Sequence, residues 1–170
     1  MPSSPPKIRV VGDPVLHAPA RQVTDFDADL AALIEGMFAA TAAAQGVGLA
    51  APQVGVSLAL FVYDCPDETG VRRRGHVVNP SIETSGVTEL HDEGCLSVPG
   101  PYAELARAER ATVRGVDRTG APVEVSGTGY FARCLQHEVD HLNGVLYIDH
   151  LPRNRRRRVL RDMTPFDWNA

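Results

Sequence analysis

The sequence predicts an α+β fold, in which a mostly antiparallel sheet packs around a central helix that carries an HExxH motif, with one further helix towards each end of the chain. Three observations predict it. Helical periodicity appears near the N-terminus, short β-branched segments bounded by turn residues fill the middle, and helical patterns return after residue 128. Because helices and strands do not alternate, a parallel βαβ sheet is not expected.

Composition and charge are those of an ordinary folded chain. With 170 residues, 44% hydrophobic and 22% charged, residues 1–170 are expected to form a single domain around one core. The net charge of −4 argues against a general nucleic-acid binder, and no apolar run is long enough to span a membrane. Residues 1–7 lack the apolar stretch of a signal peptide and are expected to be a disordered lead-in. Three cysteines form no disulfide framework, which favours the reducing cytoplasm.

The first helix is expected between Thr24 and Gly46. Thr24 and Asp25 are residue types that begin helices, and glycine is a residue type that ends them. Between them, apolar residues recur at positions i, i+3, i+4, i+7 and i+8, which predicts one buried face. The residues of this face are Leu30, Leu33, Ile34, Met37 and Phe38.

Short strands are expected in the middle of the chain, where the helical period disappears. Segments rich in β-branched residues occupy residues 57–64, 75–83, 111–117 and 122–127. The turn sequence "DRTG" separates the last two, which are therefore expected to form a hairpin. Helices follow at residues 129–142, where Asn143 and Gly144 end the helix, and at 152–163, with a tail to residue 170.

The helix at 129–142 separates polar from apolar residues. At about 100° per residue, His137, Glu138 and His141 fall within about 100° of one another. Two imidazoles one helical turn apart can share a metal ion. The opposite side of the helix is apolar, so we expect the helix to lie inside the protein; that side holds Leu135, Val139 and Leu142.

A third ligand is needed to complete such a metal site. Cys134 lies on the same helical face as the histidines, but it is roughly 10 Å from His141 along the axis. Ligand atoms of one tetrahedral ion lie only about 3 to 4 Å apart, so Cys134 is expected to line a pocket beside the metal. Cys95, in the loop "HDEGCLSVPG", can deliver a thiolate from outside the helix. Cys65, at a strand end, is expected to be structural.

Two imidazoles and one thiolate would leave a fourth position open for water, as in catalytic metal sites. Glu138 is adjacent to the ligands and is then the natural general base. HExxH is also the motif of zinc endopeptidases, although these usually take a downstream Glu or His as third ligand. A non-enzymatic metal-binding or RNA-binding module is another alternative, and it would leave Glu138 without a role.

Three motifs together resemble those of the peptide deformylase family. They are "GVGLAAPQVG" (46–55), "EGCLS" (93–97) and "QHEVDHLNG" (136–144), in that family's order and spacing, and "VVGDPVLHAPA" is similar to its N-terminal segment. The resemblance runs from about residue 8 to residue 151. It implies an enzyme that removes the formyl group from the N-terminal formyl-methionine of new polypeptides.

The resemblance also implies the chemistry of the site. Cys95, His137 and His141 would bind one divalent metal ion, and Glu138 would be the catalytic acid–base. A mixed thiolate and imidazole site accepts iron(II), zinc, nickel or cobalt. Among these the resemblance favours iron(II).

Oxyanion and substrate contacts follow from the same resemblance. The side-chain amide of Gln53 and the backbone N–H of Leu96 would stabilise the oxyanion, although Gln53 could instead brace a glycine-rich turn. Val47 and Gly48 fall where the family's substrate-binding strand begins. The formylated peptide would then add beside a strand edge, with its methionine side chain in an apolar pocket.

Five further residues are expected around this site. Tyr130 and Cys134, one helical turn apart, are candidates to line the methionine pocket. Glu93, in the loop that holds Cys95, could pair with Arg107, or both could be solvated surface charges. Tyr102 stands where many relatives place a basic residue, so contacts beyond the methionine are expected to differ here.

The predicted C-terminal helix is strongly basic. It contains six arginines within nine residues: Arg153, Arg155, Arg156, Arg157, Arg158 and Arg161. One interpretation is a solvated cationic helix. The other is an electrostatic contact with ribosomal RNA near the nascent-chain exit, which would suit an enzyme that acts on new polypeptides.

Overall fold

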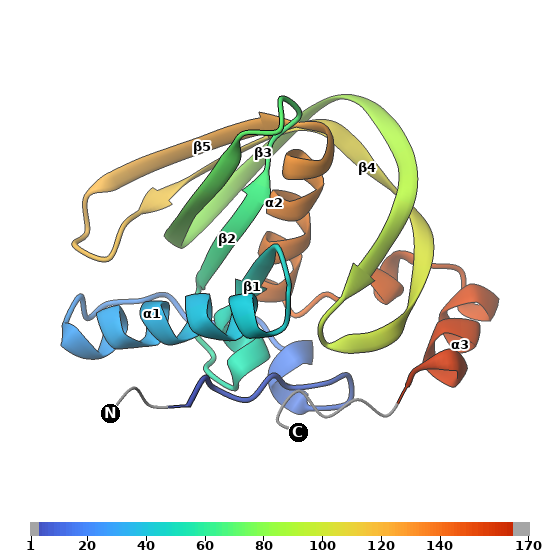
Figure 1. The fold of residues 1–170 in the computed structure, drawn as a ribbon, viewed down its shortest axis with the longest axis horizontal. Coiled ribbons are helices and arrows are strands. Elements are labelled where there is room, and N and C mark those ends of the chain that lie inside the picture. Colours follow the sequence, from blue (N-terminus) through green and yellow to red (C-terminus); the bar gives the residue numbers. More distant parts are fainter. Residues whose placement is uncertain (1–3, 165–170) are drawn as a thin grey trace.

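Five strands form one antiparallel sheet in the computed structural model, which describes residues 4–164 (Figure 1). Each strand pairs with the next one along the chain, so the order across the sheet is β1-β2-β3-β4-β5. The strands are β1 (Gly48–Ala50), β2 (Leu60–Pro66), β3 (Arg72–Cys95), β4 (Val98–Val116) and β5 (Pro122–Thr128). The predicted α+β class with antiparallel pairing is confirmed.

Three α-helices complete the fold. They are α1 (Ala28–Ala43), α2 (Gly129–Leu142) and α3 (Arg153–Asp162), and short 3₁₀ helices occupy Pro14–His17, Ala51–Val54 and Tyr147–His150. None of the helices in the described part of the chain is long and apolar enough to cross a membrane. The ends of the predicted lead-in and tail, residues 1–3 and 165–170, lie outside the described residues.

The beginning and end of α1 differ from the prediction. Asp27, rather than Thr24 or Asp25, caps the helix, because its carboxylate accepts the Leu30 backbone N–H at 3.0 Å. The helix also ends at Ala43, before the predicted Gly46, because Gln45 takes a positive φ of 55°. The predicted apolar face packs into a core with β1 and β2, and only Leu33 of its five residues remains partly exposed.

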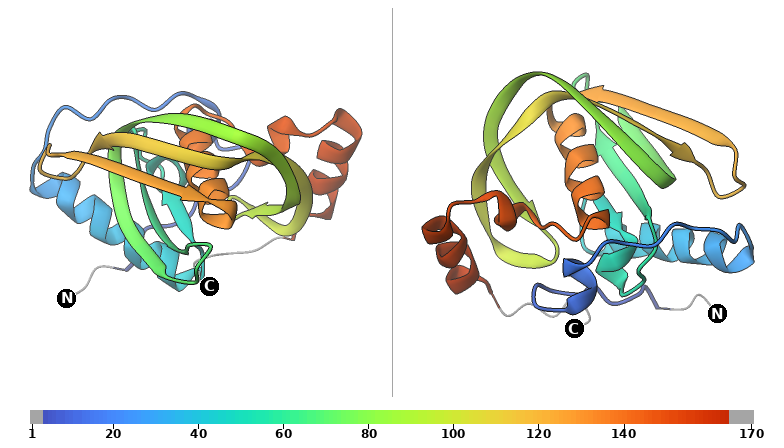
Figure 2. Two further views of the ribbon diagram at one scale, coloured as in Figure 1. Left: turned by 90° about the horizontal axis from the view of Figure 1, so that it is seen from above. Right: turned by 180° about the vertical axis from the view of Figure 1, so that it is seen from behind.

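The long β3–β4 hairpin is the main departure from the predicted strands. The prediction gave residues 75–83 and 111–117, whereas β3 has 24 residues and β4 has 19. Register shifts between Val78 and Ser81, and again farther along, break the ladder, so the hairpin can bend. Figure 2 shows it arching around α2. Cys95 pairs with Val98 across a two-residue turn, so it ends a strand and does not lie in a loop as predicted.

The helix α2 is the centre of the structure, and its bounds are those predicted. Asn143 caps its C-terminus and Gly144 follows with a φ of 73°. The predicted "DRTG" turn joins β4 to β5 immediately before this helix. The apolar side of α2 packs against the inner face of the sheet, with Leu135, Val139, Leu142, Phe61 and Val77 in one cluster. This packing leaves the polar side of α2 facing the β3–β4 hairpin.

Candidate metal centre and active site

The two histidines of α2 lie side by side, as their spacing of four residues requires. Their Nε2 atoms are 3.1 Å apart, and their ring centroids are separated by 4.8 Å. His141 is 1% exposed. Burial and the neighbouring His137 lower the pKa of His141 well below its usual value, so its ring is neutral, the form that binds metals.

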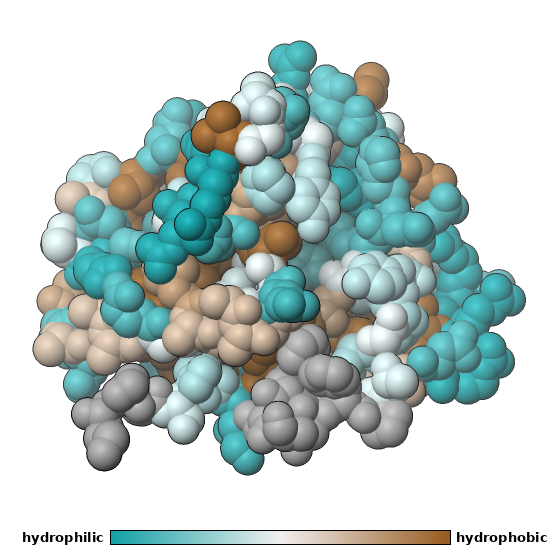
Figure 3. Space-filling view, viewed as in Figure 1, coloured by the Kyte–Doolittle hydropathy of each residue, from teal (hydrophilic) through white to brown (hydrophobic). Residues whose placement is uncertain are grey.

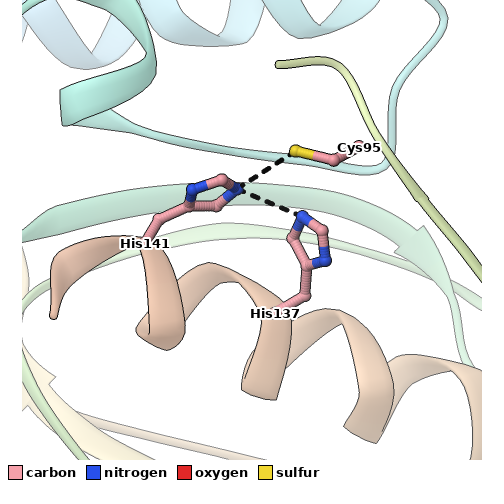
Figure 4. A group of neighbouring side chains, drawn as sticks. All are labelled: Cys95, His137 and His141. Carbon is pink, nitrogen blue, oxygen red and sulfur yellow. Dashed lines mark hydrogen bonds between the residues drawn. The ribbon is translucent and has the colours of Figure 1, made fainter. Parts of the chain in front are cut away.

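Cys95 brings a sulfur atom to the same point from the end of β3. Its Sγ lies 3.4 Å from Nε2 of His141, and the three potential ligand atoms all lie within 4.8 Å of one another (Figure 4). Ligand atoms of a tetrahedral ion are about 3 to 4 Å apart, with metal bonds of about 2.0 to 2.3 Å. One thiolate and two imidazoles in this arrangement fit a divalent transition metal ion.

An ion pair buried beneath the histidines orients one of them. Arg107 donates to both carboxylate oxygens of Glu93, at 3.0 and 2.6 Å, and Oε2 of Glu93 lies 2.9 Å from Nδ1 of His137. Burial opposes ionisation of Glu93, but the hydrogen bonds from His137 and Arg107 outweigh it and hold its pKa at about 2. The ionised carboxylate accepts the Nδ1 proton, so Nε2 of His137 presents its lone pair to the site. Of the two interpretations of Glu93 and Arg107, the paired one is therefore observed.

Replacing Arg107 by methionine is expected to lower the free energy of unfolding by about 3 kcal/mol, because it leaves two carboxylates partly or fully buried without this cation. Arg107 is 6% exposed and also donates to Asp140 at 2.6 Å. Urea unfolding would measure the change. The matched control is Arg114→Met, since Arg114 pairs with exposed carboxylates on the outer part of the sheet. Equal shifts in the two variants would contradict the structural role of Arg107.

Glu138 is buried beside the histidines without an ion pair. It is 3% exposed, and its Oε2 atom has no hydrogen-bond partner among the described residues. Burial raises the pKa of Glu138 to about 7. A carboxyl group with a pKa near the working pH can both accept and donate a proton, which is what general acid–base chemistry requires. Gly48 makes room for this side chain, because a Cβ atom there would lie 2.7 Å from Oε1 of Glu138.

The side chain of Gln53 does two things at once. Its Oε1 accepts the backbone N–H of Ala50 at 2.9 Å, which braces the turn after β1, as the simpler interpretation of this residue expects. Its Nε2 donates to Oγ of Ser97 at 3.0 Å and lies 3.7 Å from Sγ of Cys95. One N–H of the amide therefore points towards the cysteine and the space in front of it.

A cavity of about 460 Å³ opens in front of this group. This size is within the range of small-ligand sites, roughly 300 to 1,000 Å³. The cavity wall includes all the residues predicted for catalysis and substrate binding and two of the three predicted ligands: Val47, Gly48, Gln53, Cys95, Leu96, Tyr130, Cys134, His137 and Glu138. His141 lies behind the wall. Tyr102 and Tyr130 are 72% and 55% exposed, at the rim.

The other two cysteines lie together on one side of the cavity. The thiols of Cys65 and Cys134 are within hydrogen-bonding reach of each other, although neither forms a disulfide. Cys134 also approaches the carbonyl oxygen of Val47 at 3.6 Å, away from the histidine pair. Cys134 therefore stands outside the group that could hold an ion.

Three polar residues of α2 near the site escape the sequence reasoning: Arg133, Gln136 and Asp140. With His137 they form an i, i+3, i+4, i+7 stripe, and every member bonds to the β3–β4 hairpin. The spacing was available as a signal, but polar helix positions ordinarily face solvent. Only the bent hairpin turns this stripe into an interior contact.

Comparisons with known proteins find close relatives over nearly the whole chain. A family described as polypeptide deformylase matches residues 5–157. Peptide deformylase 2 of Streptomyces avermitilis is 55% identical over 163 residues, which cover 95% of this chain and 88% of that protein. A crystal structure of a peptide deformylase from Legionella pneumophila has 45% identity and a TM-score of 0.85, and covers 92% of each chain. A peptide deformylase from Synechococcus elongatus in complex with actinonin has 38% identity and a TM-score of 0.86, with 96% of this chain and 88% of that chain covered.

Proposed function

Since this chain belongs to the polypeptide deformylase family and is an enzyme that removes N-formyl groups from nascent polypeptides, we propose that Cys95, His137 and His141 hold the metal ion of that reaction. The observation that carries this proposal is the convergence of one sulfur and two ring nitrogens in front of a cavity. A divalent ion bound there would polarise the formyl carbonyl and lower the pKa of a water ligand from about 16 to about 7.

Glu138 is proposed to move the proton. It would accept a proton from the attacking water and deliver it to the amine nitrogen as the C–N bond breaks. Its position beside His137, its burial and the absence of an ion-pair partner among the described residues support this role. A buried carboxyl with no cation to hold it ionised can change its protonation state during turnover.

Gln53 and the backbone N–H of Leu96 are proposed to stabilise the oxyanion. The N–H of Gln53 that does not bond to Ser97 points towards Cys95, and Leu96 follows that cysteine directly. One such donor typically contributes about 3 to 4 kcal/mol to the transition state. Gln53 is held rigidly, because its other amide atom is bonded to Ala50.

The peptide is proposed to bind along β1. This strand is at the edge of the sheet, and Val47 and Gly48 line the cavity next to Glu138. A formylated chain could therefore extend the sheet through backbone hydrogen bonds. The methionine side chain would enter the part of the cavity bordered by Tyr130 and Cys134.

Replacing Gly48 by alanine is expected to reduce kcat about 10- to 100-fold, because the new methyl group would displace Glu138. Its Cβ would lie 2.7 Å from Oε1 and 3.0 Å from Cδ and Cγ of that residue. Steady-state kinetics with a formyl-Met peptide would measure the loss. Gly36→Ala is the control, since a Cβ atom there meets only Pro6, at 3.5 Å. An unchanged kcat in Gly48→Ala would show that Glu138 tolerates displacement.

The metal is proposed to be iron(II). The donor set of one thiolate and two imidazoles also accepts zinc, nickel and cobalt, so this choice rests on the family resemblance. Iron(II) is readily lost to oxygen, and protein isolated in air is then expected to contain zinc or nickel. Metal analysis of protein purified without oxygen is the test.

The two alternative functions are not supported. A zinc endopeptidase would cleave internal peptide bonds, and a non-enzymatic module would cleave nothing, whereas this chain is an enzyme of the deformylase family. The direct assay measures formate released from a formyl-Met peptide alongside cleavage of its internal bonds. Release of formate alone is the expected result.

The basic helix α3 is proposed to contact ribosomal RNA. Its position in Figure 1 corresponds to strongly hydrophilic surface in Figure 3. Arg155 donates to the carbonyl oxygen of Glu104, and Arg156 lies 3.5 Å from Asp149. Within the described chain the other arginines of residues 153–158 make no ion pair and are exposed: Arg153, Arg157 and Arg158.

Replacing these three arginines by alanine is expected to weaken ribosome binding and to flatten its dependence on salt. Removing one arginine that binds a phosphate reduces the slope of log K against log salt by about 1. Binding measured over a range of salt concentrations gives the slope. Replacing the same arginines by lysine preserves the charge and is expected to keep most of the slope. Unchanged affinity and slope in the alanine variant would remove the proposed contact.

The enzyme is proposed to act in the cytoplasm as one catalytic domain comprising residues 1–170. Nascent polypeptides are its substrates, and three free cysteines suit a reducing compartment. All five strands belong to one sheet, which supports a single domain.

A further inference from the structure

Two separate elements supply the proposed metal ligands, so their spacing decides whether the ligands meet. The helix α2 carries His137 and His141, and the end of β3 carries Cys95. No covalent link joins these elements near the site. Their separation therefore depends on side-chain contacts between α2 and the β3–β4 hairpin.

The polar stripe of α2 makes those contacts. Gln136 donates to the carbonyl oxygen of Ala108 at 2.9 Å and accepts its N–H at 3.2 Å, both on β4. His137 contacts Glu93 of β3, and Asp140 accepts from Arg107 of β4. Each of these three residues reaches only one strand of the hairpin.

Arg133 differs from them because it reaches both strands. Its guanidinium donates to the carbonyl oxygen of Leu105 on β4 at 2.6 Å. On β3 it donates to the carbonyl oxygens of Glu89 and His91 at 3.0 and 3.2 Å, and it lies 3.5 Å from the carboxylate of Glu93. Arg133 is 6% exposed, and it borders the cavity one helical turn before His137.

We infer that Arg133 is a positioning residue that sets the distance between Cys95 and the two histidines. This inference rests on the proposed metal site. The planar guanidinium binds three carbonyl oxygens in a fixed geometry, which a flexible side chain cannot reproduce. These contacts fix the hairpin to α2 only a few residues before Cys95.

Removing the guanidinium would leave those carbonyl oxygens without their donor in a buried place. The end of the hairpin would then relax away from α2 and carry the sulfur of Cys95 with it. Residues that orient metal ligands typically contribute about 10- to 100-fold to metal affinity. Arg133 is expected to act on that scale through the thiolate.

The test compares Arg133→Met with Arg114→Met, which removes an arginine of β4 that pairs only with exposed carboxylates. Each protein is loaded with cobalt(II), and two quantities are measured below the unfolding temperature: the thiolate-to-cobalt absorption and the rate of metal release to a chelator. In Arg133→Met the absorption is expected to weaken and release to become at least about 10-fold faster. Arg114→Met is expected to match the parent protein.

A second variant guards against misfolding. Arg133→Lys keeps the charge, but one ammonium group cannot bind three carbonyl oxygens at once, so the same changes are expected in smaller measure. Parent-like absorption and release in the folded Arg133 variants would overturn this inference and leave the proposed metal site standing. If the parent protein itself showed no thiolate absorption, the metal site would be wrong and the inference would fall with it.

Discussion

Replacing Glu138 by glutamine is expected to reduce kcat by at least about 1,000-fold while the protein stays folded and keeps its metal. Glutamine preserves the shape of the side chain but cannot accept a proton from water, and general acid–base groups contribute about 100- to 10,000-fold to catalysis. The fold is expected to survive because Glu138 forms no ion pair within the described chain. Formate release and metal content per chain, measured on the same sample, provide the result.

The combination of those two measurements makes the experiment decisive. Glu68→Gln, at an exposed glutamate between β2 and β3, is the matched control and should equal the parent enzyme. A Glu138→Gln protein that keeps a tenth or more of kcat would contradict the proposed proton transfer. Loss of metal together with activity would instead assign Glu138 a structural role.

Replacing Cys95 by alanine is expected to lower metal affinity by more than about 100-fold and to abolish deformylation. The sulfur lies 3.4 Å from Nε2 of His141, and it is the only thiol of the chain in the group that could hold an ion among the described residues. Two imidazoles alone would leave the ion with half of a tetrahedral shell. Metal analysis after dialysis against a weak chelator would measure the loss.

The remaining cysteines serve as controls for this variant. Cys65 and Cys134 lie together beside the cavity, and the thiol of Cys134 approaches Val47 rather than the histidines. Alanine at either position is therefore expected to leave metal content near that of the parent protein. Loss of metal from Cys134→Ala, with retention by Cys95→Ala, would reverse the assignment of the third ligand.

Much of the central helix is predictable from sequence, for local reasons. Its polar and apolar residues follow the helical period, and Asn143 with Gly144 ends it, so the predicted bounds of α2 agree with the structure. The position of the two histidines follows from their spacing alone. The start of α1 was less predictable, because Thr24, Asp25 and Asp27 all carry oxygen atoms suited to a helix cap, and only the geometry selects Asp27.

The long hairpin was not predictable in the same way. Residues 84–95 are mostly polar or glycine, and they are largely exposed, so they lack the alternating pattern of a strand. Their partners lie on β4, and the bulges that bend the hairpin depend on α2 beneath it. The meeting of Cys95 with the histidines, and the contacts of Arg133, depend on this bend. The sequence motifs identified the ligands, but they could not show what holds them in place.

X-ray absorption spectroscopy of the metal-loaded enzyme tests the central claim most directly, since it reports which atoms surround the ion. The proposed site predicts one sulfur at about 2.3 Å and two imidazole nitrogens at about 2.0 to 2.1 Å, with a lighter atom completing the shell. In Cys95→Ala the sulfur contribution should disappear. A parent spectrum that contains only nitrogen and oxygen neighbours would contradict the proposed metal centre.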